Sequence, residues 1–371
     1  MTTAASWGRF GTSSEGPRGG PAALVVAVED SSQVGEARRA AATVAADAGL
    51  SETERGAVAV IVTEMATNLA RHARGGRVLI SAIGSPPAAG VELLALDDGP
   101  GIGNMHRAMD DGFSTAGTAG QGLGAIRRMA HEFDVYSRTA TGPSSGGGGP
   151  GTGGGGTAVV ARVWSAAAPG AAARDESLAT GAVCVALSGE EVCGDGWIVL
   201  RRPDRVLVVV VDGLGHGPEA AEAASEALRI VRAHPDASPA DLLHAAHGAL
   251  RATRGAAMSV AAIHAARGAL TFAGVGNVGA AIYSPAGGVR NLASHNGTVG
   301  HAMRTVREFN HEWPADAGLL MHTDGINTRW RLDAYPGIVG HHPALLAGVL
   351  YRDHSRGRDD ATVVAVRDRR S

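Results

Sequence analysis

Two groups of acidic and amide side chains lie in separate halves of this 371-residue chain. In the first half Glu64 and Asn68 are four residues apart, and an Asp-Asp-Gly-Pro-Gly run begins at Asp97. The second half contains the pairs Gly194-Asp195, Asp212-Gly213, Asp324-Gly325 and Asp359-Asp360. Oxygen ligands of this kind are typical of sites where divalent cations meet phosphate groups. Both halves are therefore candidates for phosphoryl chemistry.

The first pair belongs to a predicted helix that opens at Ser51 with the character of a capping box and runs to about His72. Residues four apart on a helix share one face, so the side chains of Glu64 and Asn68 point the same way. The amide oxygen of Asn68 can coordinate a Mg²⁺ ion that bridges phosphates. The carboxylate of Glu64 can accept the proton of an attacking hydroxyl group.

Asp97 directly follows the apolar segment Val91–Leu96, which predicts a buried strand. A carboxylate at this strand end is well placed to accept a hydrogen bond from an amino group such as that of adenine. Glycines allow the backbone to turn tightly against a flat ring, and free N–H groups at a helix start attract anions. The glycines in question are Gly99, Gly101, Gly120, Gly122 and Gly124.

The chain contains no lysine, so all of its strongly basic side chains are arginines. A phosphate-binding loop with a catalytic lysine is therefore excluded, and so is a protein kinase of the eukaryotic type. If ATP binds, then metal ions, backbone amides and arginines must hold its phosphates.

In the second half, buried strands are predicted to deliver carboxylates to one edge of a sheet. Asp212 ends the strand Val206–Val211, and Asp324 follows the strand Leu319–His322. Clustered carboxylates repel one another unless cations lie between them, and two Mg²⁺ or Mn²⁺ ions can activate water for attack on a phosphoryl group. One Asp-Gly pair alone is typical of a turn, but the four pairs in this order favour a two-metal hydrolase.

Composition limits the partners and the compartment. The net charge is −3 and no basic block is present, so a nucleic-acid partner is not expected. No apolar run is long enough to span a membrane, and residues 1–20 lack the apolar centre of a secretory signal. We therefore expect a cytoplasmic protein. Cys184 and Cys193 are too few for a disulfide framework and are expected to be reduced thiols.

The pattern of segments predicts an α+β protein with two domains. Residues 1–20 are a disordered lead, and 21–164 form the first domain, with a glycine-rich hairpin insertion at 142–156. Residues 165–176 are the predicted linker, and 177–371 form the second domain.

Residues 21–164 resemble the GHKL (Bergerat) ATPase fold, most closely the small bacterial serine kinases of the anti-sigma-factor and stress-switch type. The matching stretches are VTEMATNLARHA, LDDGPGI, AMDDGFSTAG and GQGLGAIRRMAHEFDV. This resemblance implies that Glu64 is the catalytic base, that Asn68 binds Mg²⁺ and that Asp97 binds the adenine of ATP. It also implies that the five glycines shape the pocket and that Thr157 supports the adenine contact.

Residues 177–368 resemble the SpoIIE-like branch of the metal-dependent type 2C protein phosphatases, through the stretches GDGW and DGLGHG. The resemblance implies an αββα sandwich with two Mn²⁺ or Mg²⁺ ions. Asp212 would bridge both ions, joined by the carbonyl of Gly213. The other implied ligands are Asp324, Asp359 and Asp195, with Asp360 beside them. The sequence does not separate the role of Asp359 from that of Asp360.

The two resemblances together imply a serine/threonine kinase and a phosphatase that act on the same mark. The expected substrate is a STAS-domain protein, either an anti-anti-sigma factor or a stressosome component, with a sigma factor or a downstream phosphatase as further partners. Two alternatives stay open. The first domain could be an ATP-binding switch that gates the phosphatase without transferring phosphate, or an anti-sigma domain that holds a sigma subunit.

Overall fold

The computed structural model describes residues 22–109, 122–139, 155–166, 178–284 and 288–369. The predicted lead, nearly all of the glycine-rich insertion, most of the predicted linker and Gly120 lie outside these ranges. None of the helices in the described ranges is both long and apolar enough to cross a membrane.

The N-terminal part is built on one antiparallel sheet with the strand order β1-β2-β3-β5-β4. The strands are β1 (Leu24–Ala27), β2 (Arg77–Ile83), β3 (Gly90–Asp97), β4 (Glu132–Arg138) and β5 (Gly156–Trp164). The central strands β3 and β5 are buried almost throughout. Their near-continuous apolar sequence follows from burial on both faces of the sheet.

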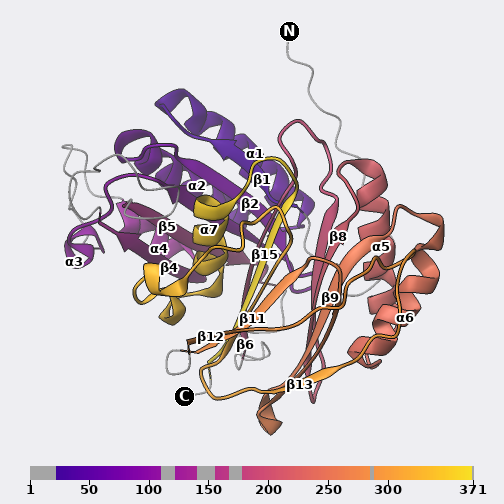
Figure 1. Cartoon of the computed structure of the whole chain (residues 1–371). Coiled ribbons are helices and arrows are strands. Elements are labelled where there is room, and N and C mark those ends of the chain that lie inside the picture. The colour runs from indigo at the N-terminus through magenta and orange to yellow at the C-terminus, as the bar shows by residue number, and fades with distance from the viewer. Residues whose placement is uncertain (1–21, 110–121, 140–154, 167–177, 285–287, 370–371) are drawn as a thin grey trace.

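Helices cover one face of this sheet (Figure 1). They are α1 (Val34–Asp47), α2 (Glu52–His72), α3 (Met105–Met109) and α4 (Gly122–Met129). The expected capping box of α2 is confirmed, because Ser51 Oγ accepts from the amide of Glu54 and Glu54 Oε2 accepts from the amide of Ser51. This cap fixes where the long helix begins and hence which of its residues face the sheet.

The C-terminal part contains two five-stranded sheets that pack face to face. One sheet has the order β13-β10-β9-β8-β7 and the other the order β12-β11-β14-β15-β6. The bounds are β6 (Leu178–Val185), β7 (Asp195–Arg201), β8 (Val206–Gly213), β9 (Ala256–His264), β10 (Ala269–Val275), β11 (Gly279–Ser284), β12 (Gly288–Asn291), β13 (Phe309–Glu312), β14 (Gly318–His322) and β15 (Ala361–Asp368).

Helices cover the outer faces of this pair of sheets. Helices α5 (Pro218–Ala233) and α6 (Pro239–Ala249) pack on the sheet that contains β8, and α7 (Pro343–His354) packs on the sheet that contains β15. The predicted α+β class and the αββα sandwich are confirmed. Short 3-10 helices lie at Ser31–Gln33, Leu250–Ala252, Ala265–Arg267, Leu332–Ala334 and Ile338–Gly340.

Helix α7 lies between the two parts of the molecule (Figure 1). One core cluster joins its residues to Leu79, Leu94 and Val160 of the N-terminal sheet and to apolar residues of β6 and β15. The molecule is thus a continuous stack in which α7 is the layer that both parts share. Close contact requires Gly348, because a Cβ there would lie 2.8 Å from Cδ2 of Leu94.

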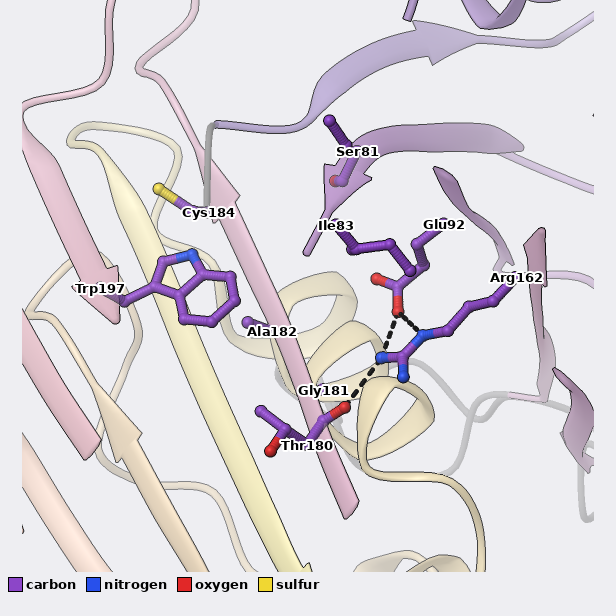
Figure 2. A pocket seen from close by; sticks show the side chains of 10 residues that line it. Ser81, Ile83, Glu92, Arg162, Thr180, Gly181, Ala182, Cys184 and Trp197 are labelled. Carbon is purple, nitrogen blue, oxygen red and sulfur yellow. Dashed lines mark hydrogen bonds and ion pairs between the residues drawn. The ribbon is translucent and has the colours of Figure 1, made fainter. Parts of the chain in front are cut away.

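Polar contacts reinforce this junction. The amide of Ala23 donates to the carbonyl of Cys184 at 2.6 Å. Figure 2 shows Arg162 of β5, which donates to Glu92 Oε2 at 2.7 Å and to the carbonyl of Thr180 in β6 at 2.8 Å. These groups line a small cavity of about 30 Å³ together with Trp197. A charged pair buried at the junction must keep its partners, so it fixes how the two sheets meet.

Candidate active sites

The end of α2 is tied to the loop that contains Asp97. The amide of Asp98 donates to the carbonyl of Arg74 at 3.0 Å. Asn68 lies one turn before the end of this helix and Glu64 one turn earlier, and both are half-buried. Burial raises the pKa of Glu64, against the opposing charge of Arg71. A carboxylate with a raised pKa accepts a proton more readily than a fully solvated one.

Asp97 ends β3 and lies opposite Thr157 in the register of β3 and β5. Its Oδ1 accepts a hydrogen bond from the amide of Gly99 at 2.7 Å, which fixes the orientation of the carboxylate. Burial raises the pKa of Asp97, while the hydrogen bond from Gly99 and the charge of Arg352 oppose this rise. The structure therefore brings Asp97 and Thr157 together, as the sequence predicts.

Two glycines of this loop have steric reasons to be glycine. At Gly99 a Cβ would lie 2.7 Å from Oδ1 of Asp97. Gly101 has a φ of 77°, and a Cβ there would overlap the carbonyl of Arg138. Both positions let the backbone pass close to the carboxylate and to β4. Gly122 and Gly124 lie in the first turn of α4, and Gly120 lies outside the described residues.

Ser137 of β4 is a member of this region that sequence reasoning missed. Its Oγ lies 3.0 Å from Oγ1 of Thr157 and accepts from the amide of Ile102 at 2.8 Å. Ser137 thus connects the glycine loop to the strand that carries Thr157. A serine in an alternating strand gives no distinctive sequence signal, so only the pairing of β4 with β5 reveals it.

Arg352 of α7 reaches the same region from the C-terminal part. Its side chain is 3% exposed, and its Nη1 donates to the carbonyl of Asp97 at 2.8 Å. Its Nε lies 3.4 Å from Oδ1 of Asp98. The C-terminal part therefore contributes a buried cation to the surroundings of the predicted adenine site.

The second candidate site lies where β7, β8 and β14 end. Asp195 and Asp212 are opposite each other in the register of β7 and β8. Oδ2 of Asp195 accepts a hydrogen bond from Oγ1 of Thr323 at 2.7 Å. Oγ1 of Thr323 in turn accepts a hydrogen bond from the amide of Thr362. Burial raises the pKa of Asp195 well above its ordinary range, and the neighbouring carboxylate of Asp212 adds to this.

Asp212 faces further negative charge. Burial, followed by repulsion from Asp324 and Asp359, raises the pKa of Asp212 to about 7. Oδ2 of Asp324 accepts from the side-chain amide of Asn277 at 2.6 Å. Burial and Asp359 raise the pKa of Asp324, and Arg356 opposes this. Asn277, Thr323 and Arg356 are neighbours of the site that sequence reasoning missed.

Asp359 and Asp360 have different surroundings. Oδ1 of Asp360 accepts from the amide of Leu187 at 2.7 Å, and Oδ2 accepts from the amide of Gly194 at 2.8 Å. Asp360 thus fastens the loop that leads to Asp195 and is engaged at both oxygens. Asp359 Oδ1 accepts only a local bond from the amide of Asp360, and its charge acts on Asp212 and Asp324.

The donor set fits a divalent cation in its chemistry. Asp212, Asp324 and Asp359 are hard oxygen donors, and the raised pKa of Asp212 reflects its burial and the repulsion from the other two carboxylates. Gly213 contributes a backbone carbonyl at the same strand end, and its lack of a Cβ admits the backbone of Ala220. Across the described ranges, no three His, Cys, Asp or Glu side chains are already arranged to hold a metal ion.

A hollow of about 500 Å³ lies at the end of β10 that leads to Asn277. Val275, two residues before Asn277, lines it, and so do the exposed Arg304 and Arg307. The ring of His295 stacks on that of Phe309 at 5.7 Å between centroids and forms one wall. The hollow therefore combines a flat aromatic wall with two cations.

The two cysteines are free, as expected. Sγ of Cys184 lies 3.6 Å from Sγ of Cys193, in the strand and loop that flank Asp195.

Two families match the chain. The family described as "Histidine kinase-like ATPase domain" matches residues 27–144, and "Stage II sporulation protein E (SpoIIE)" matches residues 202–369. The serine/threonine-protein kinase RsbT of Bacillus subtilis (strain 168) is 31% identical over 106 residues, which cover 29% of this chain and 80% of RsbT. The phosphoserine phosphatase RsbX of the same organism is 24% identical over 139 residues, which cover 38% of this chain and 70% of RsbX.

Among solved structures, that of RsbX in complex with magnesium is similar to this chain. The match covers 52% of this chain and 96% of the RsbX chain, with 21% sequence identity and a TM-score of 0.48. The two family matches fall on the two parts of the fold and include most residues of the two candidate sites, although Thr157 and Asp195 lie outside the matched ranges. The chain belongs to the histidine kinase-like ATPases through its N-terminal domain, and its C-terminal domain matches the SpoIIE family.

Proposed function

We propose that this protein both adds phosphate to, and removes it from, serine or threonine of a STAS-domain regulator in the cytoplasm. The observation that carries the proposal is the presence, on one chain, of two sets of side chains suited to phosphoryl chemistry. Glu64 and Asn68 lie one helical turn apart on α2, and the segment after this helix is hydrogen-bonded to the loop at Asp98, while Asp212 faces Asp324 and Asp359. An anti-anti-sigma factor or a stressosome component is the proposed substrate, by analogy with the partners of stress-switch kinases.

In the kinase reaction, Asp97 accepts a hydrogen bond from the amino group of adenine, and the amide of Gly99 holds the carboxylate in position. The amide oxygen of Asn68 would help to hold a Mg²⁺ ion, which would supply neutralising charge for the phosphates. Glu64 accepts the proton of the substrate hydroxyl as it attacks the γ-phosphoryl group. The raised pKa of Glu64 suits a group that accepts a proton and later releases it.

In the phosphatase reaction, Asp212, the carbonyl of Gly213, Asp324 and Asp359 would hold two Mn²⁺ or Mg²⁺ ions together with Asp195. When bound, such ions neutralise the phosphoryl group and activate water. Thr323 keeps the Asp195 carboxylate oriented, and Asn277 does the same for Asp324. Asp360 holds the loop before Asp195 through two backbone amides.

The hollow beside Asn277 is the proposed docking place for the chain segment that flanks the phosphorylated residue. Arg304 and Arg307 are exposed there and can donate to carboxylate or phosphate oxygens of a partner protein. Such contacts would act on a protein substrate and not on a small phosphate ester.

A second candidate function is an ATP-binding switch that gates the phosphatase without phosphotransfer. The contact of Arg352 with Asp97 favours it, because a residue of the phosphatase domain borders the ATP site. Both candidates predict ATP binding, so phosphotransfer has to separate them.

The test uses the full chain with a STAS-domain protein from the same organism, in two assays. The first follows transfer from γ-labelled ATP with Mg²⁺, in the wild type and in Glu64→Gln. The second follows Mn²⁺-dependent release of phosphate from the labelled product, in the wild type and in Asp212→Asn. Loss of phosphotransfer only in Glu64→Gln, and of phosphate release only in Asp212→Asn, supports the proposal that the protein has both activities. ATP binding without transfer in the wild type supports the switch.

A further inference from the structure

Arg352 joins the two candidate sites through backbone groups and not only through charge. It belongs to α7 of the phosphatase domain, yet its Nη1 donates to the main-chain carbonyl of Asp97 at 2.8 Å. That carbonyl lies at the end of β3, in the residue whose carboxylate is proposed to read adenine. A shift of Arg352 would therefore move the backbone that carries this carboxylate.

The start of β5 is fitted to the same guanidinium. A Cβ placed on Gly156 would lie 2.4 Å from Nη1 of Arg352 and 2.5 Å from the carbonyl of Asp97. Gly156 directly precedes Thr157, which lies opposite Asp97. The absence of a side chain at Gly156 is what allows Arg352 to reach the strand end. The end of β3 and the start of β5, which are neighbours in the proposed ATP site, thus both lie against the buried guanidinium of Arg352.

Arg352 is itself held in one orientation. Its Nε and Nη2 donate to the two oxygens of Asp353 at 2.6 and 3.1 Å. Asp353 also accepts from the hydroxyl of Tyr335 at 2.8 Å. Arg138 of β4 lies over the ring of Tyr335 and donates to the carbonyl of Ala334 at 2.6 Å. Because the guanidinium is planar and is bound to both oxygens of Asp353, its remaining N–H group has little freedom to move.

Beyond Arg352, α7 runs directly into the phosphatase site. The carbonyl of His354 accepts from the amide of Asn327 at 2.8 Å, and the amide of Arg356 donates to the carbonyl of Gly325 at 2.8 Å. Gly325 follows Asp324, and the chain continues from Arg356 to Asp359. The helix that supports the adenine loop is thus hydrogen-bonded to the loop that carries the carboxylates.

We propose that Arg352 is a positioning residue of the nucleotide site, supplied by the phosphatase domain, and that it sets how well the site reads the amino group of adenine. The inference rests on the proposed ATP site and does not require phosphotransfer. Because energetic coupling is reciprocal, nucleotide binding must then bias α7 and the loops that it joins.

The experiment compares the affinities of the full chain for Mg-ATP and for Mg-ITP, in which a carbonyl oxygen replaces the 6-amino group. We expect the wild type to prefer ATP. In Arg352→Ala the dissociation constant for ATP should rise roughly tenfold, as expected for loss of a charge-assisted hydrogen bond, while that for ITP changes little. A merely structural role would weaken both nucleotides equally.

Further variants keep the test decisive if Arg352→Ala folds poorly. Arg352→Lys retains the charge but cannot serve Asp97 and Asp353 at once, so its discrimination should be intermediate. Gly156→Ala should lower discrimination with Arg352 still present. Arg267→Ala, an exposed arginine on a 3-10 helix far from both sites in the chain, is the matched control and should behave as the wild type.

The outcomes separate this inference from the proposed function. A wild type that binds neither nucleotide overturns the ATP site and the inference together. A wild type that prefers ATP, with the same ratio of affinities in Arg352→Ala, overturns the inference alone. Protection of the α7 amides from hydrogen exchange should increase with ATP in the wild type and not in Arg352→Ala.

Discussion

Asp195 lies directly opposite Asp212 where β7 and β8 pair, so two carboxylates of adjacent strands share one buried edge. The pKa values of both groups are raised, by burial first and then by negative neighbours. Such an arrangement costs stability unless something compensates the charge.

Asp212→Asn should remove Mn²⁺-dependent hydrolysis of p-nitrophenyl phosphate. The expected loss is at least roughly a hundredfold, because metal positioning supplies several kcal/mol of transition-state stabilisation. Steady-state turnover against Mn²⁺ concentration measures it. Nucleotide binding should persist in this variant, since Arg352 and α7 are unchanged. Turnover equal to that of the wild type would remove Asp212 from the proposed site.

Asp359→Asn and Asp360→Asn should fail in different ways. Asp360 accepts two backbone amides, so its variant should lower the free energy of unfolding by about 1–3 kcal/mol. Asp359→Asn should weaken the response to Mn²⁺ with little change in stability. Thermal melts and Mn²⁺ titrations of both variants decide this, with the exposed Asp204→Asn as control. Equal melting losses in both would contradict the distinction.

Glu64→Gln should lower phosphotransfer to the STAS-domain protein by roughly 10²–10⁴-fold, the usual contribution of a general base. The isosteric amide keeps the half-buried side chain in place, so the dissociation constant for Mg-ATP should stay within about twofold. Single-turnover transfer and equilibrium binding are the two measurements. If transfer survives the substitution, a different residue takes the proton.

Arg304→Ala and Arg307→Ala should affect only the protein substrate. Each removes a cation from the hollow beside Asn277, so KM for the phosphorylated protein should rise roughly tenfold, the value of one charge-assisted hydrogen bond. The kcat for p-nitrophenyl phosphate should not change. Parallel steady-state assays on the two substrates reveal the difference, and an equal effect on both would place the arginines elsewhere in the mechanism.

The acid stability of the junction should depend on Glu132. Burial would raise the pKa of Glu132, but contact with His342 and Arg162 and the hydrogen bond from Trp164 lower it to about 2. A carboxylate with a lowered folded pKa stabilises the protein above its unfolded value of about 4.3. That contribution is lost as the pH falls from there toward 2.

Melting temperatures of the wild type and Glu132→Gln between pH 6 and pH 2 test this. The gap between the two proteins should be widest at pH 6 and should close on acidification. A gap that is constant with pH would mean that Glu132 contributes nothing through its charge.

Sequence patterns were informative where chemistry demands particular residues. Asp97, Asp195, Asp212 and Asp324 each stand at a strand end, as the apolar runs before or after them indicated. Their neighbours Ser137, Asn277 and Thr323 were not predictable, because a single hydroxyl or amide becomes significant only when distant strands pair.

Helix α7 could not be predicted from the sequence. It is buried without interruption from Pro343 to Tyr351, so it lacks the polar stripe that marks an amphipathic helix. The sequence of a helix packed between two sheets is an apolar run that lacks the helical period of an amphipathic helix. The strands β12 and β13 also give little sequence signal, because they are four residues each and β12 is exposed throughout.

The shared layer formed by α7 limits how this chain can be divided. Cutting within the predicted linker 165–176 would leave Leu79, Leu94 and Val160 without their cover, and would strip α7 of one of its two contact faces. The shared cluster would be exposed in both fragments, so each is expected to aggregate or to recapture the other. Folding thus fixes the two candidate sites in a one-to-one ratio, and damage to this one helix reaches both of them.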